Sequence, residues 1–198
     1  LREALRDRLV RTMLVTSGAV TLCAATMNVG ELVLAQEDLG AGATGFALLV
    51  SAYGLGLVVG ALRAGRDGEN SRRLYFAGLG GVALGMVGTA FAPTLAVALL
   101  TFGFTGAANG LFSTSHRILL QRVVPEPVHG RVFGLAASLD GWGFGLAVIA
   151  GGAIATAFGG RALFGLAGAL LLVVWAGAAL ALRDRGPRLA PAISAAQG

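Results

Sequence analysis

The chain has 198 residues, of which 56% are hydrophobic and only 13% are charged, and its mean hydropathy is +0.77. Soluble domains carry about 25% charged residues, so the charged side chains here are too few to cover a surface that faces water. The composition excludes an ordinary soluble protein and favours a surface that faces lipid.

The net charge is +5, and all fifteen basic residues are arginine. They stand between apolar runs and are not gathered on one soluble face, so no nucleic-acid partner is predicted. The single Cys23 lies inside an apolar run, which excludes a disulfide framework or a cysteine-based metal site. No cofactor is predicted.

Apolar runs long enough to cross a bilayer, which takes about 20 helical residues, occur six times along the chain. Stretches rich in glycine, proline or charge separate them. The predicted spans are 13–34, 44–62, 74–91, 95–115, 132–158 and 162–182. The predicted fold is an all-α membrane protein, in which a six-helix bundle at 13–182 follows an amphipathic linker at 1–12 and precedes a polar tail at 183–198.

The arginines fall on one side of this arrangement. Fourteen lie before the first span or after the second, fourth and sixth spans, and only Arg161 lies on the other side. Because short cytoplasmic loops carry an excess of Lys and Arg, both termini are expected in the cytoplasm and the spans in the cell membrane. The stretch SHRILLQRVVPEPVHGRVFG (115–134) is then a cytoplasmic loop, in which prolines end one helix before the next begins.

Glycines spaced four apart place two small residues on one helix face, which lets membrane helices approach closely. Such spacing occurs in four of the predicted spans, and some pairs are expected by chance in a chain with 32 glycines. The pairs are Gly56/Gly60, Gly81/Gly85, Gly106/Gly110 and Gly141/Gly145.

Two loop motifs resemble those of the major facilitator superfamily of transporters. GALRAGRDGENSRR (60–73) is similar to the signature loop between the second and third helices of a six-helix half, although Ala64 occupies the usual acidic position and Asp67 is displaced. LLQRVVPEPVHGRVFG (119–134) is similar to the Gln-Arg … Pro … Gly-Arg-Val loop of efflux-type members. The residues that match, and that the resemblance makes candidates for a gating loop, are Gly60, Arg66, Gly68, Arg72, Arg73, Arg122, Gly130 and Arg131.

The resemblance favours the C-terminal half, because LREALRDRLVRTML (1–14) is similar to the linker that leads into the seventh helix. It implies two inverted three-helix repeats, with an N-terminal six-helix half in the same chain or in a partner completing the pathway. It also implies alternating-access transport of a small molecule across the bilayer, with proton-coupled efflux as the expected form. A non-transporting membrane scaffold or receptor-type subunit remains the alternative.

Polar residues within the apolar spans are candidates for substrate or proton binding. Asp140 lies about 13 Å along a helix from Arg131, and a carboxylate in that layer is expected to face protein or water. It is either a protonatable site or a buried contact, for example with Arg117. The other candidates are Glu31, Asn28, Asn109 and Trp142.

An enzyme is not predicted. Ser115 and Ser138 lack the G-x-S-x-G setting of an activated nucleophile. His116 and His129 have no further ligand at metal spacing, so no metal site is predicted either.

Overall fold

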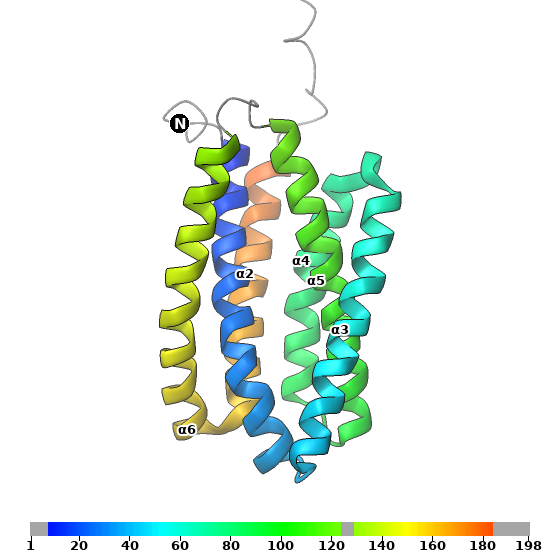
Figure 1. Ribbon diagram of the computed structural model, residues 1–198, viewed down its shortest axis with the longest axis vertical. Coiled ribbons are helices and arrows are strands. Elements are labelled where there is room, and N and C mark those ends of the chain that lie inside the picture. Colours follow the sequence, from blue (N-terminus) through cyan, green and yellow to red (C-terminus); the bar gives the residue numbers. More distant parts are fainter. Residues whose placement is uncertain (1–7, 124–128, 184–198) are drawn as a thin grey trace, which may run out of the picture.

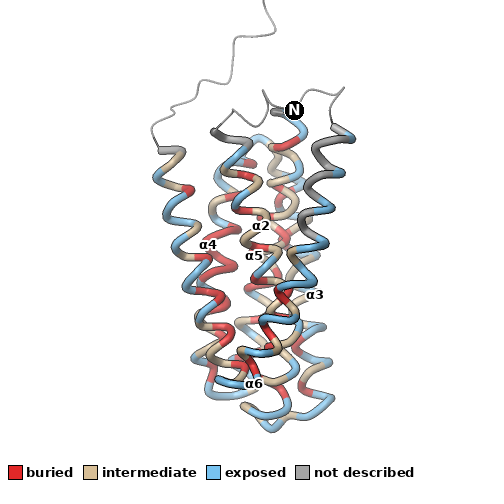
Figure 2. Tube along the Cα trace, turned by 90° about the vertical axis from the view of Figure 1, so that its left-hand side faces the viewer, coloured by how far each residue is buried: buried red, intermediate tan, exposed pale blue. Residues whose placement is uncertain are grey.

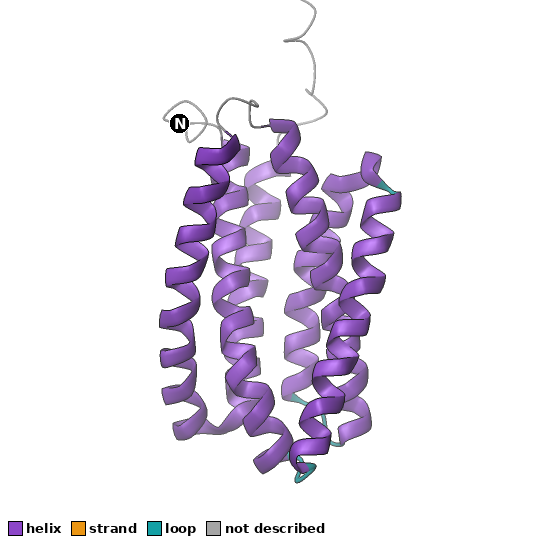
Figure 3. Cartoon of the chain, in the orientation of Figure 1, coloured by secondary structure: helices purple, strands orange, loops and turns teal. Residues whose placement is uncertain are grey.

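The structure is a computed structural model that describes residues 8–123 and 129–183. Side chains are described at 11–122, 130, 134, 137–138 and 141–181. Within these ranges the chain is almost entirely helical and contains no strand (Figure 3).

In the described part of the chain, five α-helices run up and down between two ends of an elongated bundle (Figure 1). A π-helical turn, η1, continues directly from the end of α2, and a short 3-10 turn, η2, precedes α4. The bounds are α2 Arg8–Val33, η1 Leu34–Asp38, α3 Gly42–Arg66, η2 Gly68–Asn70, α4 Ser71–Ala90, α5 Leu95–Val123 and α6 His129–Arg183.

The longest element, α6, consists of two arms. The backbone leaves helical geometry at Gly159, where φ is 82° and ψ is 169°, and the two arms run in opposite directions from this residue (Figure 1). A positive φ is readily adopted only by glycine. The next residue, Gly160, packs so closely on α2 and η1 that a Cβ would lie 2.8 Å from the Leu34 nitrogen and 2.9 Å from the Gly30 oxygen.

Among the described residues, four helical stretches are long and apolar enough to cross a bilayer: Arg11–Asp38, Gly42–Arg66, Leu95–Arg122 and Gly141–Ala181. The last includes both sides of the break at Gly159. The predicted span at 74–91 forms α4 but is not among the four, and Arg72 and Arg73 in the first turn of this helix contribute to its lower mean hydropathy. More than half of the 20 residues of α4 are buried by other helices, so it does not need a strongly apolar surface of its own.

The predicted loop at 115–134 is shorter in the structure. α5 continues to Val123 and α6 begins at His129, while 124–128 lie outside the described residues. The sequence interpretation ended the span at the first polar residues, but Arg117 and Arg122 are good helix formers. Only the prolines at 125 and 127 are incompatible with a continuing helix.

Backbone contacts between α3 and α5 confirm two of the predicted glycine pairs. A Cβ at Gly56 would overlap the Gly103 carbonyl oxygen, and one at Gly60 would overlap the Ala107 carbonyl oxygen. From the other helix, Gly106 and Gly110 meet the backbone of α3 in the same way. The backbones of the two helices are therefore in contact at these glycines.

The glycines of α4 serve similar contacts. A Cβ at Gly81 would lie 2.8 Å from Ala108 Cβ, and one at Gly85 would overlap the Thr105 hydroxyl oxygen. The Trp175 indole nitrogen on the second arm of α6 donates a 3.0 Å hydrogen bond to the Phe76 carbonyl oxygen. α4 is thus held on α5 and on α6, and its core residues are the most continuous buried stretch in Figure 2.

The fourth glycine pair, Gly141/Gly145, faces open space, since a Cβ at either position would meet nothing within 4 Å. Large apolar side chains are exposed on the same arm of α6 and on α3, among them Leu55 at 72% and Ile149 at 73%. Such exposure is unfavourable in water and ordinary in lipid or against another protein surface.

Candidate functional site

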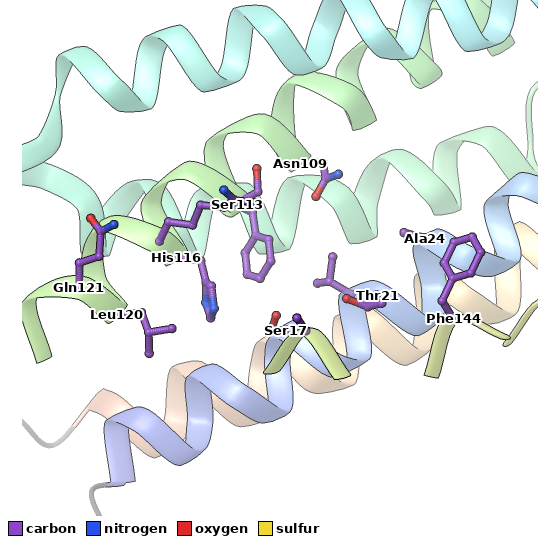
Figure 4. Close-up of a pocket in the computed structure, with 13 residues that line it drawn as sticks. Ser17, Thr21, Ala24, Asn109, Ser113, His116, Leu120, Gln121 and Phe144 are labelled. Atoms are coloured by element: carbon purple, nitrogen blue, oxygen red, sulfur yellow. The ribbon is translucent and has the colours of Figure 1, made fainter. Parts of the chain in front are cut away.

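A cavity of about 700 Å³ lies between α2, α5 and the first arm of α6 (Figure 4). It exists because α2 packs mainly on α6 and α5 packs mainly on α3 and α4, so that α2 and α5 barely touch. Several of the lining side chains are small, among them Ser17, Ala24 and Ser113. The lining residues are Ser17, Val20, Thr21, Ala24, Asn109, Phe112, Ser113, His116, Arg117, Leu120, Gln121, Ala137 and Phe144.

The cavity is long and has two chemically different ends. Gln121 lies near the end of the bundle where α5 finishes, while Asn109, twelve residues earlier on the same helix, lies about 18 Å deeper. Figure 4 shows Ala24 and Phe144 beside the deep end and Leu120 beside the outer end. We call the end with Gln121 the arginine end, because the exposed residues Arg63, Arg66, Arg72, Arg73 and Arg122 lie there.

Asn109 is held in place by a neighbouring helix. Its amide nitrogen donates a 2.6 Å hydrogen bond to the Tyr53 hydroxyl on α3. This bond uses one donor of the amide and leaves the amide oxygen for another partner. Of the four candidates for substrate or proton binding whose side chains the structure describes, Asn109 is the one that lies in the cavity wall.

An aromatic stack supports the wall between α4 and α5. The Tyr75 ring lies 5.1 Å from the Phe112 ring and 6.1 Å from the His116 ring, and Phe112 and His116 are 5.7 Å apart, measured between centroids. Tyr75 is fully buried, and its hydroxyl hydrogen-bonds the Thr16 hydroxyl on α2. The stack therefore fixes the imidazole at the cavity surface and ties α4 to α2 below it.

The other three described candidates have different positions. Asn28 is exposed and donates a 3.0 Å bond to the Ala24 carbonyl oxygen within its own helix. Glu31 is half-buried and is not part of the cavity wall. Trp142 is 79% exposed, and it is two positions, or about 200° of helical rotation, from Phe144. It therefore lies outside the cavity.

Asp140 has a described backbone, but its side chain lies outside the described residues, as does the side chain of Arg131. Position 140 is three residues after Ala137 and four before Phe144, both of which line the cavity. Residues three and four apart share one face of a helix. The backbone thus places position 140 on the face of α6 that borders the cavity.

The turn between α3 and α4 is held by local polar contacts. Asp67 accepts a 2.9 Å hydrogen bond from the Asn70 side chain and pairs with Arg63 at 3.0 Å. These two contacts, the Asn70 bond first, hold the pKa of Asp67 below its ordinary value. The displaced acidic residue of the first loop motif is therefore engaged within its own turn.

The two loop motifs meet in space. The Arg122 guanidinium reaches from the end of α5 to η2, where a Cβ on Gly68 would be 3.8 Å from its Nη2 atom. Gly60 lies buried in the α3–α5 contact, whereas Arg66, Arg72 and Arg73 are exposed. Gly130 is also exposed, at the start of α6.

Sequence reasoning missed most of the cavity wall, although a signal was present. Polar residues recur every three or four positions on two otherwise apolar helices, which places them on one face of each. On α2 these are Ser17 and Thr21, and on α5 they are Asn109, Ser113, Arg117 and Gln121.

These features define a multi-pass helical membrane protein with a polar cavity inside an apolar bundle. Residues 13–197 match the family model described as Major Facilitator Superfamily. An uncharacterized MFS-type transporter of Bacillus subtilis (strain 168), YfiS, is 32% identical over 181 residues, which covers 84% of this chain and 42% of that protein. The chain belongs to the major facilitator superfamily and spans less than half the length of this relative.

Proposed function

We propose that the chain is the C-terminal six-helix half of a transporter that moves a small molecule across the cell membrane by alternating access. The observation that carries this proposal is the cavity between α2, α5 and α6. A cavity of about 700 Å³ with polar side chains in its wall, inside an otherwise apolar bundle, is costly to maintain and is typical of a site for a passing solute. Membership of the family and the likeness to an MFS-type transporter support it.

The proposed architecture has six spans arranged as two inverted repeats of three, the first formed by α2, α3 and α4 and the second by α5 and the two arms of α6. In this arrangement the six helices of this half form one wall of the cavity. A second six-helix half, in the same chain or in a partner, would close it, and the match to 42% of a longer relative supports a missing half. Small-molecule sites of such transporters lie between the two halves.

We propose that the arginine end faces the cytoplasm, together with both termini. The support is the charge asymmetry, since Arg161 is the one described arginine at the opposite end. The contact between Arg122 and η2 joins the two loop motifs there, and we assign these loops to a cytoplasmic gate, in which Gly130 and Arg131 contribute from α6. The resemblance of the second loop supports efflux as the direction.

Proton coupling is assigned to Asp140. Its position on the face of α6 that borders the cavity supports this role, because a carboxylate there could exchange a proton as the cavity changes access. Glu31 and Asn28 lie away from the cavity and have at most a secondary role in this scheme.

Access to the cavity from both sides of the membrane tests the proposal without knowledge of the substrate. Ser113→Cys, in a full-length protein with Cys23→Ala, introduces one thiol in the cavity wall. A membrane-impermeant maleimide should modify it in right-side-out and in inside-out vesicles, because the population of an alternating-access transporter includes both states. Modification from one side only would favour a non-transporting scaffold.

A further inference from the structure

Among the described lining residues, the permanent charge in the cavity wall is positive. Arg117 is the one permanently charged lining residue, His116 is the other titratable lining residue, and none of the described lining residues carries a carboxylate. None of the described carboxylates pairs with Arg117, whose side chain lines the cavity.

The other described polar residues of the cavity wall can form hydrogen bonds and carry no permanent charge. α2 contributes Ser17 and Thr21, and α5 contributes Gln121 and the imidazole of His116. From α6, the nearest carboxylate by sequence is Asp140, whose side chain lies outside the described residues. Any test of the cavity's charge preference therefore has to distinguish the effect of the Arg117 charge from that of the Asp140 charge.

Deeper in the bundle, two aromatic side chains join Asn109 in the cavity wall. Phe112 is fixed by its contact with Tyr75, and Phe144 lines the cavity from α6 beside Ala24 (Figure 4). A ligand that spans the cavity would therefore meet a guanidinium near the arginine end and aromatic surfaces deeper in the bundle.

We propose that the cavity selects an organic anion with an aromatic or apolar body. The anionic group, a carboxylate or sulfonate, pairs with Arg117, and the body packs on Phe112 and Phe144. Guanidinium groups bind carboxylates through two parallel hydrogen bonds, which gives geometry as well as charge selection. Binding of the anion follows from the cavity itself, whereas its transport rests on the proposed function.

The electrostatic part is tested with two thiol reagents of similar size and opposite charge. In full-length protein with Cys23→Ala and Ser113→Cys, reconstituted in phosphatidylcholine vesicles, the rates of modification by the anionic sulfonatoethyl and the cationic trimethylammoniumethyl methanethiosulfonate are compared. The ratio of the two rates is divided by the same ratio for free cysteine. One unpaired charge several ångströms away in a wet cavity should raise this normalised ratio about fivefold in favour of the anion.

Arg117→Gln should bring the normalised ratio to one or below. Arg161→Gln, which removes the same charge at the opposite end of the bundle and outside the cavity wall, should leave it unchanged. A preference for the cationic reagent that disappears in Asp140→Asn would assign the cavity to cations and overturn the proposal. Failure of both reagents to modify Ser113→Cys would also overturn it, because a closed cavity admits no anion.

The ligand class is tested by protection with three isosteric probes. Benzoate should slow modification of Ser113→Cys, whereas benzamide and benzylamine should not, and Arg117→Gln should abolish the protection by benzoate. Equal protection by all three would show apolar binding without charge selection. Protection by added phosphatidylglycerol and not by benzoate would assign Arg117 to lipid headgroups, and either result would overturn the proposal. Modification from one membrane side with intact benzoate protection would instead refute transport alone.

Discussion

Asp38 Oδ2 accepts a 3.1 Å hydrogen bond from the backbone nitrogen of Arg161, across 123 positions of sequence. Arg161 is in the first turn of the second arm of α6, where backbone N–H groups have no partner within the helix. The carboxylate thus caps the arm at the point where Gly159 breaks α6, and it holds the π-helical end of α2 against that break.

Asp38→Ala should destabilise the protein by about 0.5–2 kcal/mol, the usual cost of losing a helix N-cap. The measurement is the midpoint of thermal unfolding of the detergent-solubilised full-length protein. Glu37→Ala is the matched control, since Glu37 is an exposed neighbour in the same turn. Equal midpoints for the two variants would show that the cap contributes nothing.

Gly60→Ala should force α3 and α5 apart, because the new Cβ has no room beside the Ala107 carbonyl group. Overpacking of this kind costs about 1–3 kcal/mol. Gly65→Ala in the same helix is the control, since a Cβ there meets nothing within 4 Å, and it should be neutral or stabilising by up to about 1 kcal/mol. Yield after size-exclusion chromatography and the unfolding midpoint measure both effects.

The proposed orientation predicts that single cysteines at Thr44→Cys and Glu69→Cys, in a Cys23→Ala background, react from opposite sides of the membrane. Both side chains are exposed, and they lie at opposite ends of α3 and its following turn. In intact cells an impermeant maleimide should modify the cysteine at 44 and spare the one at 69. Reaction of both from the same side would contradict the spans as well as the orientation.

Asp140→Asn should abolish proton-driven transport while the protein still folds, because the amide keeps the shape of the carboxyl group and cannot titrate. Transport is measured in proteoliposomes with and without an imposed pH gradient. If Asp140 has instead a structural contact with Arg117, the variant should lose thermal stability, and Arg117→Gln should partly restore it. Normal gradient-driven transport by a well-folded variant would exclude the coupling role.

The contribution of the turn between α3 and α4 to protein stability should depend measurably on pH in the acid range. Because the folded-state pKa of Asp67 is lowered by Asn70 and Arg63, its contribution to stability is complete above the ordinary pKa of an aspartate. The contribution disappears as the pH falls through the lowered value. The difference in unfolding midpoint between the unmodified protein and Asp67→Asn should therefore be present at neutral pH and shrink in strong acid. A difference that is constant with pH would contradict this assignment.

The helices, and three of the four glycine pairs that make close helix contacts, could be predicted because apolar length and glycine spacing are local properties of the sequence. The face on which each helix meets the others could not, since α2 and α6 are apolar on nearly every side. The sequence therefore did not predict that Trp142 and Asn28 lie outside the cavity, or that Arg117 lies in its wall. The π-helical turn at Leu34–Asp38 was not predicted either, and the residue that packs closely against it, Gly160, comes from a distant part of the chain.

The reversal of α6 at a single glycine also has a consequence for biosynthesis. Two apolar arms joined without a connecting loop leave only the short turn at Gly159, with Arg161 as its one charged side chain, to be carried across the bilayer between them. Their insertion is therefore expected to be concerted, with both arms entering the membrane as one helical hairpin. A short tag placed between Gly159 and Gly160 would separate the arms, and would be tolerated less well than the same tag placed in the turn that contains Glu69.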